Sequence, residues 1–215
     1  MIKIADEGNN NLPYFTNAAF DVVVIAASAG GLTALAKVLS TLPTEFTAPI
    51  AIVQHLGPRH RSFMAEILDR RTTLNVKQAE EGDYLTPGTV YIAPPNRHLL
   101  ANSDGTLSLS QSELVHFLRP SADLLFESVA AIYKDTVIAL VLTGTGRDGA
   151  MGIEAIKKMG GTVIVQDIKT AEFTGMPSAA IQTGKVDFIL PLDEISSTLV
   201  SLVMSNVEIK SEFSN

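Results

Sequence analysis

The chain has 215 residues, with 16 Lys and Arg against 23 Asp and Glu, a formal net charge of −7 and no cysteine. This composition excludes a disulfide framework, thiolate metal ligands and a cysteine nucleophile, and the negative charge disfavours binding to nucleic acid or to anionic membranes. No apolar run approaches the roughly 18 residues that a membrane span needs, and the polar N-terminus lacks the apolar core of a signal peptide. We therefore expect a soluble cytoplasmic protein without direct membrane insertion.

Between residues 21 and 204, short apolar runs alternate with segments of helical spacing, and polar tails are predicted at 1–20 and 205–215. Apolar runs without polar alternation are typical of strands covered on both faces. Strands are predicted at 21–27, 49–54, 136–142, 162–166 and 186–190. Helices are predicted from about residue 30 to 42 and at 61–71, 121–133, 149–159, 177–183 and 193–204. This alternation predicts one doubly wound α/β domain with a mainly parallel sheet.

Residues 74–112 break the alternation. Short strand-like pieces at 89–93 and 106–109 lie on either side of Asp104-Gly105, and Asp-Gly between such pieces indicates a hairpin. We expect an antiparallel hairpin excursion from the otherwise parallel architecture.

Polar residues follow three of the predicted strands directly or within a short turn. Ser28 and His55 each come directly after an apolar run, and Asp148 lies in the Gly-Thr-Gly-Arg-Asp-Gly turn after a third. Ligands of doubly wound sheets bind beyond the carboxyl ends of the strands. A serine nucleophile needs a base, and the base needs an acceptor that fixes its tautomer, so the set supplies one candidate for each role. Taken singly, Ser28 and Asp148 could instead cap helices, and His55 could be an ordinary loop histidine.

Glycine-rich turns follow two of these strands, and they leave backbone N–H groups unshielded at helix starts. Such groups favour developing negative charge, which makes an oxyanion hole plausible there. The candidate donors are Ala29, Gly30, Gly31, Gly144, Thr145 and Gly146.

A dinucleotide-binding module is the alternative interpretation of the second turn. Gly144, Gly146 and Gly149 match the G-x-G-x-x-G pattern, and Asp167 follows about 20 residues on. The Asp148 carboxylate would however repel a pyrophosphate, and only about 65 residues follow the pattern. The four histidines show no zinc-binding spacing, so no metal site is expected.

The chain resembles the catalytic domain of chemotaxis protein-glutamate methylesterases of the CheB type. The matching segments are IAASAGG (25–31), VQH (53–55), PGTVYIAPPNRHL (87–99), RPSADLLFES (119–128), VLTGTGRDGAMG (141–152), QD (166–167), GMPSAAI (175–181) and LPLDEI (190–195). They run through nearly the whole chain in the family's order. Two positions depart from the family pattern, Ala29 where a threonine is usual and Thr145 where a methionine is usual, and these bear on rate and specificity.

The resemblance implies a three-layer α/β/α catalytic domain over residues 21–204 that needs no cofactor. It implies that Ser28 is the nucleophile, His55 the base and Asp148 the orienting carboxylate. The implied reaction is hydrolysis of glutamate γ-methyl esters on chemoreceptors with release of methanol, together with deamidation of receptor glutamines.

The expected partner is a methylated chemoreceptor or a similar signalling protein. Only about 20 residues precede the first predicted strand, so we expect no receiver domain in this polypeptide. Regulation would then come from a separate receiver-domain protein, or be absent, or the substrate would lie outside ordinary chemotaxis. The sequence also leaves open a catalytically idle receptor-binding scaffold and a general hydrolase of small esters.

Overall fold

The computed structural model describes residues 20–55 and 62–204. Both predicted tails, apart from Phe20, lie outside these described residues, and so does Arg61 at the start of the helix predicted at 61–71. The extent predicted for the catalytic domain therefore stays a prediction.

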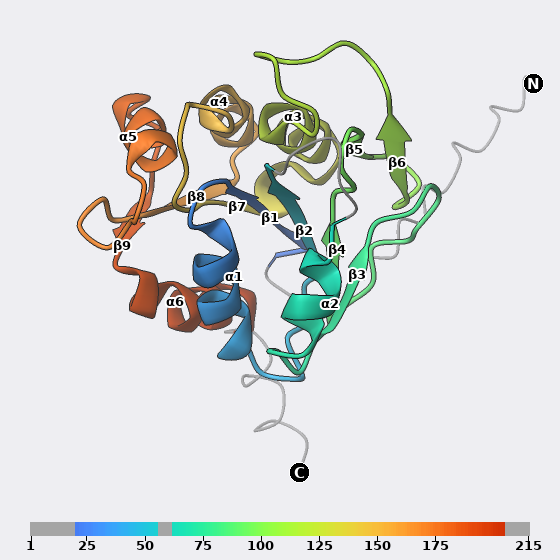
Figure 1. The fold of residues 1–215 in the computed structure, drawn as a ribbon, viewed down its shortest axis with the longest axis horizontal. Coiled ribbons are helices and arrows are strands. Elements are labelled where there is room, and N and C mark those ends of the chain that lie inside the picture. The colour runs from blue at the N-terminus through green and yellow to red at the C-terminus, as the bar shows by residue number, and fades with distance from the viewer. Residues whose placement is uncertain (1–19, 56–61, 205–215) are drawn as a thin grey trace, which may run out of the picture.

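Across the described residues, seven parallel strands form one sheet in the order β3-β4-β2-β1-β7-β8-β9 (Figure 1). The doubly wound, mainly parallel fold class is confirmed. The strands are β1 (Val22–Ala27), β2 (Ile50–Gln54), β3 (Asn75–Gln78), β4 (Thr89–Ile92), β7 (Val137–Val141), β8 (Thr162–Gln166) and β9 (Phe188–Leu190).

Helices cover both faces of this sheet, which makes three layers (Figure 1). One face carries α3 (Ala122–Tyr133), α4 (Ala150–Lys158) and α5 (Gly175–Gln182), and the other carries α1 (Gly31–Ser40), α2 (Met64–Asp69) and α6 (Leu192–Met204). A short 3₁₀ turn at Lys134–Thr136 leads into β7. Within the described ranges, none of these helices has both the length and the hydrophobicity that crossing a bilayer requires.

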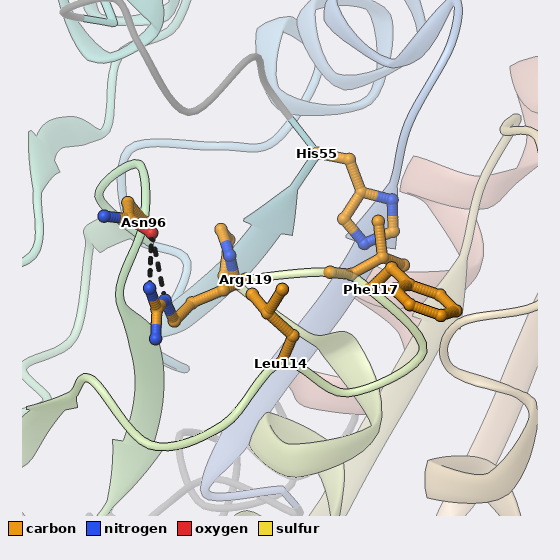
Figure 2. Close-up of a pocket in the computed structure, with 7 residues that line it drawn as sticks. His55, Asn96, Leu114, Phe117 and Arg119 are labelled. Carbon is orange, nitrogen blue, oxygen red and sulfur yellow. Dashed lines mark hydrogen bonds between the residues drawn. The ribbon is translucent and has the colours of Figure 1, made fainter.

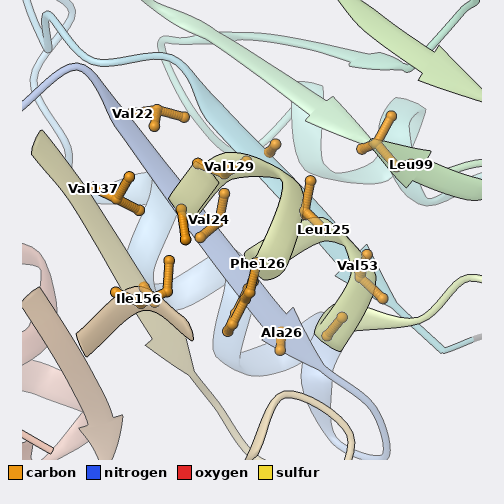
Figure 3. Packing of buried hydrophobic residues seen from close by; sticks show 14 of the residues in the cluster. Val22, Val24, Ala26, Val53, Leu99, Leu125, Phe126, Val129, Val137 and Ile156 are labelled. Carbon is orange, nitrogen blue, oxygen red and sulfur yellow. The ribbon is translucent and has the colours of Figure 1, made fainter. Parts of the chain in front are cut away.

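The central strand β1 shows why the sheet needs cover on both sides. All six of its residues are buried, so neither face can remain in water. Val22, Val24 and Ala26 pack under α3, and Figure 3 shows Phe126 of that helix near Val24 and Ala26. The alternate residues of β1 belong to the second core, beneath α1 and α6. This two-sided burial fixes the register of β1 and hence where its carboxyl end lies.

The predicted hairpin exists, but one of its strands was assigned wrongly. The Asp104-Gly105 turn joins β6 (Leu107–Ser110) to β5 (His98–Ala101), not to the piece at 89–93. That piece forms β4, which is wholly buried and pairs in parallel with β2 and β3. The apolar side chains of β4 are covered inside the main sheet, whereas the excursion is limited to the two strands that follow. The polar sequence of β3 and the histidine in β5 concealed both strands from the hydrophobic pattern.

Candidate active site

The strand register brings Ser28 and His55 to adjacent positions. Ala27 pairs with Gln54, so the next residues, Ser28 and His55, end neighbouring strands side by side. The His55 amide donates to the carbonyl of Ala27 at 3.1 Å, and the Ser28 amide donates to the carbonyl of Thr143 beyond β7 at 3.1 Å. Both residues continue the set of β1 and β2 side chains that faces α3. The carboxyl edge of the sheet thus presents a hydroxyl and an imidazole on the same face.

Asp148 reaches this face because its carboxylate is held at the start of α3. Asp148 Oδ2 accepts hydrogen bonds from His55 Nε2 at 2.8 Å and from the amide of Ala122 at 2.6 Å. Asp148 Oδ1 accepts from the hydroxyl of Ser121 at 2.8 Å and from the amide of Asp123 at 3.1 Å. The carboxylate is 2% exposed and has four donors, including the first amides of a helix, where negative charge is favoured. Asp148 is therefore fully engaged before any substrate binds.

These contacts settle the charge of Asp148 and the tautomer of His55. Burial opposes ionisation, but the hydrogen bonds from His55 and from the α3 amides outweigh it, so the pKa of Asp148 lies below its ordinary value. An ionised carboxylate only accepts hydrogen bonds, so His55 Nε2 carries the proton that points to Asp148. His55 Nδ1 then holds the lone pair, and it is this nitrogen that a nucleophile must meet.

A second carboxylate, that of Asp123, links the start of α3 to the start of α4. Asp123, in the first turn of α3, accepts hydrogen bonds from the amides of Gly149 at 2.9 Å and Gly152 at 2.7 Å, at the start of α4. Asp148, which directly precedes Gly149 and α4, binds the start of α3 instead of capping its own helix. Burial, together with the nearby charge of Asp148, raises the pKa of Asp123 to about 6. Asp148 therefore does bind the start of a helix, but that helix is α3 and not α4, which follows Asp148 in the chain.

Ser28 occupies a tight strand–turn–helix corner. Gly30, with φ of +75°, precedes the first residue of α1, and the Ser28 side chain makes no cap hydrogen bond there. Within the described residues, the Ser28 hydroxyl and His55 Nδ1 make no hydrogen bond to each other or to any other group. Nucleophile–base contacts are often looser in a free enzyme and tighten with substrate. The Ser28–His55 hydrogen bond that the reaction requires would therefore form when substrate binds.

Gln54, which lies in the matching segment VQH (53–55) but was assigned no role from the sequence, links the backbone at Ser28 to the backbone at His55. Its side-chain amide Nε2 donates to the carbonyl of Ser28 at 2.7 Å and to the carbonyl of His55 at 3.1 Å. The side chain is 4% exposed, and a Cβ at Gly31 would collide with its Oε1. Gln54 thus fixes the two loop backbones relative to each other, and Gly31 provides the space that it needs.

The candidate oxyanion donors divide into two groups. The amide of Gly31 donates to the carbonyl of Ser28 at 2.8 Å, and the amide of Gly144 donates to the carbonyl of Phe173 at 3.0 Å. The amides of Ala29, Gly30, Thr145 and Gly146 have no acceptor within the described residues. A Cβ on Gly144 would lie 2.9 Å from Ser28 Cβ, so this loop packs directly against the nucleophile. Ala29 and Gly30 directly follow Ser28, and Thr145 and Gly146 directly follow Gly144, so free amides occur in both turns that adjoin the nucleophile.

A pocket of about 270 Å³ opens beside His55. It is lined by His55, Asn96, Leu114, Phe117, Leu118, Arg119 and Pro120 (Figure 2). Arg119 donates to Asn96 Oδ1 at 3.0 and 2.8 Å, and these contacts fix one wall. Apart from His55, this lining comes from the loops after β4 and β6. Parts of both loops belong to the matching segments 87–99 and 119–128, but the sequence assigned them no catalytic role.

Comparison with known proteins identifies the family of this site. The family model described as CheB methylesterase matches residues 23–199. The chain belongs to the CheB methylesterase family. The match contains Ser28, His55 and Asp148, together with the turns around them.

Individual relatives and a solved structure support the same family assignment. A Leptospira interrogans protein is 44% identical over 189 residues, which is 88% of this chain and 98% of that protein. The protein-glutamate methylesterase/protein-glutamine glutaminase of Pyrococcus horikoshii is 41% identical over 184 residues, and this chain spans only 50% of its length. The crystal structure of the Thermotoga maritima CheB methylesterase catalytic domain matches with a TM-score of 0.82 at 40% identity, covering 86% of this chain and 99% of that domain.

Membership of the CheB methylesterase family, together with the geometry, leaves the dinucleotide interpretation without support. The turn at Gly144 packs against Ser28 Cβ and the sulfur of Met176, and its amide already has a protein acceptor. Asp148 lies within the same turn as a buried, ionised carboxylate, which would oppose a pyrophosphate at that helix start.

Proposed function

We propose that this chain is a serine hydrolase that removes methyl esters from glutamate γ-carboxyls of chemoreceptors and releases methanol. The observation that carries the proposal is the Asp148–His55 hydrogen bond of 2.8 Å at the strand end next to Ser28. The family match and the names of curated relatives such as the Pyrococcus horikoshii enzyme support the choice of substrate.

The proposed reaction is a two-step acyl transfer. His55 accepts the Ser28 proton at Nδ1 as the hydroxyl attacks the γ-carbonyl carbon of the esterified glutamate. The imidazolium that forms donates its Nε2 hydrogen bond to the Asp148 carboxylate, whose four hydrogen bonds hold the ring in place. His55 then protonates the departing methoxide oxygen, and the glutamyl group remains on Ser28 as an ester. Water, deprotonated by His55, cleaves that ester and restores the serine.

Negative charge on the carbonyl oxygen is greatest in the tetrahedral intermediate. The uncommitted amides of Ala29, Gly30, Thr145 and Gly146, in the two turns that adjoin Ser28, supply the proposed oxyanion donors. The same arrangement can deamidate a glutamine side chain, because His55 would protonate the departing amide nitrogen, which leaves as ammonia, as it protonates the methoxide oxygen, which leaves as methanol. We include this glutaminase activity in the proposal, in line with the name of the Pyrococcus horikoshii relative.

The remaining parts of the proposal concern extent and location. We propose residues 21–204 as the catalytic domain, since the strands that carry the three residues and their covering helices lie within it. The cytoplasmic location belongs to the same proposal.

The test is methanol release from membranes that carry methylated receptor, comparing wild type with Ser28→Ala. The variant should lose on the order of 10⁴-fold in turnover while its melting temperature stays unchanged. Labelling by a serine-reactive phosphonate at Ser28 should accompany activity. A wild-type chain that is neither labelled nor active would be an idle scaffold, and one that cleaves only small free esters would be a general esterase.

A further inference from the structure

Two exposed hydrophobic side chains stand at the mouth of the pocket beside His55. We call Leu114 and Phe117 the apolar rim. Leu114 is 52% exposed and Phe117 is 93% exposed, yet both line the pocket that contains the base (Figure 2). Large apolar side chains kept in water next to a catalytic pocket mark a surface that is covered when a ligand binds.

The backbone that presents Phe117 is strained. Val115 and Leu118 exchange two backbone hydrogen bonds, of 3.1 and 2.8 Å, and close a two-residue turn. His116 and Phe117 occupy the turn with φ of +50° and +64°. Two-residue turns with positive φ at both central positions usually contain Asn-Gly or Asp-Gly, because bulky side chains are disfavoured there. Here a large ring is held outward at an energetic cost, which typically indicates function.

The base of the turn is anchored, so the ring has a defined place. Arg119 donates to the carbonyls of Gln111 at 3.0 Å and Ser112 at 2.7 Å. The buried His98 bonds the carbonyl of Glu113 through Nε2 at 3.0 Å. The loop is therefore attached on both sides of Leu114, and the apolar rim keeps a fixed relation to His55.

We propose that the apolar rim binds apolar side chains that flank the esterified glutamate in the protein substrate. This inference rests on the proposed methylesterase function and adds a determinant of sequence preference to it. An aliphatic or aromatic neighbour would cover Phe117 and Leu114 while the γ-ester lies at Ser28 and His55. A polar neighbour would lose its water against the same surface without gaining a partner.

The test compares two peptides that contain one γ-methyl glutamate flanked either by leucines or by serines. Wild type should show a kcat/KM about tenfold or more higher for the leucine peptide. Phe117→Ala should reduce this preference to about one, and because the readout is a ratio of two peptides, it does not depend on any change in the rate of ester cleavage itself. Phe188→Ala is the matched control, because Phe188 is a partly exposed phenylalanine on the distant edge strand β9, and it should change nothing.

Phe117→Gly separates binding from folding. Glycine accepts positive φ without strain, so this variant should melt no lower than wild type and should still lose the peptide preference. A wild type that cleaves the two peptides alike, or cleaves neither while demethylating receptor, would overturn the apolar rim alone. So would a concentration-dependent dimer that Phe117→Ala abolishes, since a second copy would then cover the rim. Failure to release methanol from receptor as well would instead overturn the proposed function.

Discussion

The two sides of the pocket are built in opposite ways. On one side, Asp148 is 2% exposed, and regular strand ends and helix starts hold the proposed catalytic groups in place. On the other side, Phe117 is 93% exposed, on a strained turn outside the regular elements. The difference teaches that the reactive groups depend on the packing of the whole domain, whereas substrate preference is assigned to a loop that can change without altering that packing.

The largest effect should come from the buried side. Asp148→Asn keeps the size of the side chain but introduces a donor toward His55 Nε2, so the ring would adopt the Nδ1–H tautomer and lose its lone pair toward Ser28. We expect a fall in turnover of about 10³–10⁴-fold, for protein and small-ester substrates alike. Steady-state kinetics with both substrates check this result. A loss of turnover confined to the protein substrate would mean that Asp148 acts on substrate preference, and it would contradict the division of roles between the two sides of the pocket.

Gln54 offers the next largest effect. Gln54→Leu preserves volume but removes the donor to the carbonyls of Ser28 and His55, and it leaves both groups without that partner. Turnover should fall about 10- to 100-fold, with a smaller change in KM, because the nucleophile and the base lose their fixed separation. The control is Gln166→Leu on β8, three strands from β2, which removes the side-chain oxygen that accepts a hydrogen bond from the amide of Thr143 and should cost less turnover. Equal losses of turnover in the two variants would mean that Gln54 contributes no more to positioning Ser28 and His55 than Gln166 does.

The pH dependence of stability tests the contacts by which the Asp123 carboxylate links α3 to the start of α4. Because the pKa of Asp123 rises to about 6 on folding, its contribution is fully favourable below the unfolded pKa near 3.8 and is lost as the pH rises through 6. Asp123→Asn can still accept the amides of Gly149 and Gly152 but does not titrate. Relative to this variant, wild type should lose roughly 1–2 kcal/mol of unfolding free energy between pH 4 and pH 7. Urea unfolding at several pH values measures it, and parallel curves would contradict the charge argument.

The smallest effect should come from loosening the exposed side. Arg119→Met removes the donors to Asn96, Gln111 and Ser112 while keeping an apolar stem. We expect kcat/KM to fall about three- to tenfold for a protein substrate and to stay unchanged for a small ester. A loss of the same size with both substrates would mean that the loop supports the catalytic residues directly.

The sequence was sufficient to predict the features that depend on local pattern. Continuous apolar runs located five of the seven parallel strands, and the residues that end two of them, with the turn after a third, supplied Ser28, His55 and Asp148. The role of Gln54 could not be predicted, because it depends on the β1–β2 register rather than on the neighbours of Gln54 in the chain. The link from Asp148 to α3 was hidden for the same reason, since it arises only when α3 packs against α4.

The turn at His116 and Phe117 was missed for a different physical reason. Its sequence has none of the Gly, Asn or Asp residues by which positive φ is usually recognised, so nothing local distinguishes it from an extended segment. Phe117 adopts a backbone conformation that its residue type disfavours, so rules based on residue preference fail at this position.

The contacts of Asp123 and Asp148 make the orientation of His55 depend on how α3 lies against α4. Asp148 binds both His55 and the first turn of α3, and Asp123 binds the start of α4, so a shift of one helix against the other would also move the carboxylate that orients the imidazole. Substitutions remote from Ser28, in the packing between these two helices, would therefore lower turnover without touching the serine or the histidine.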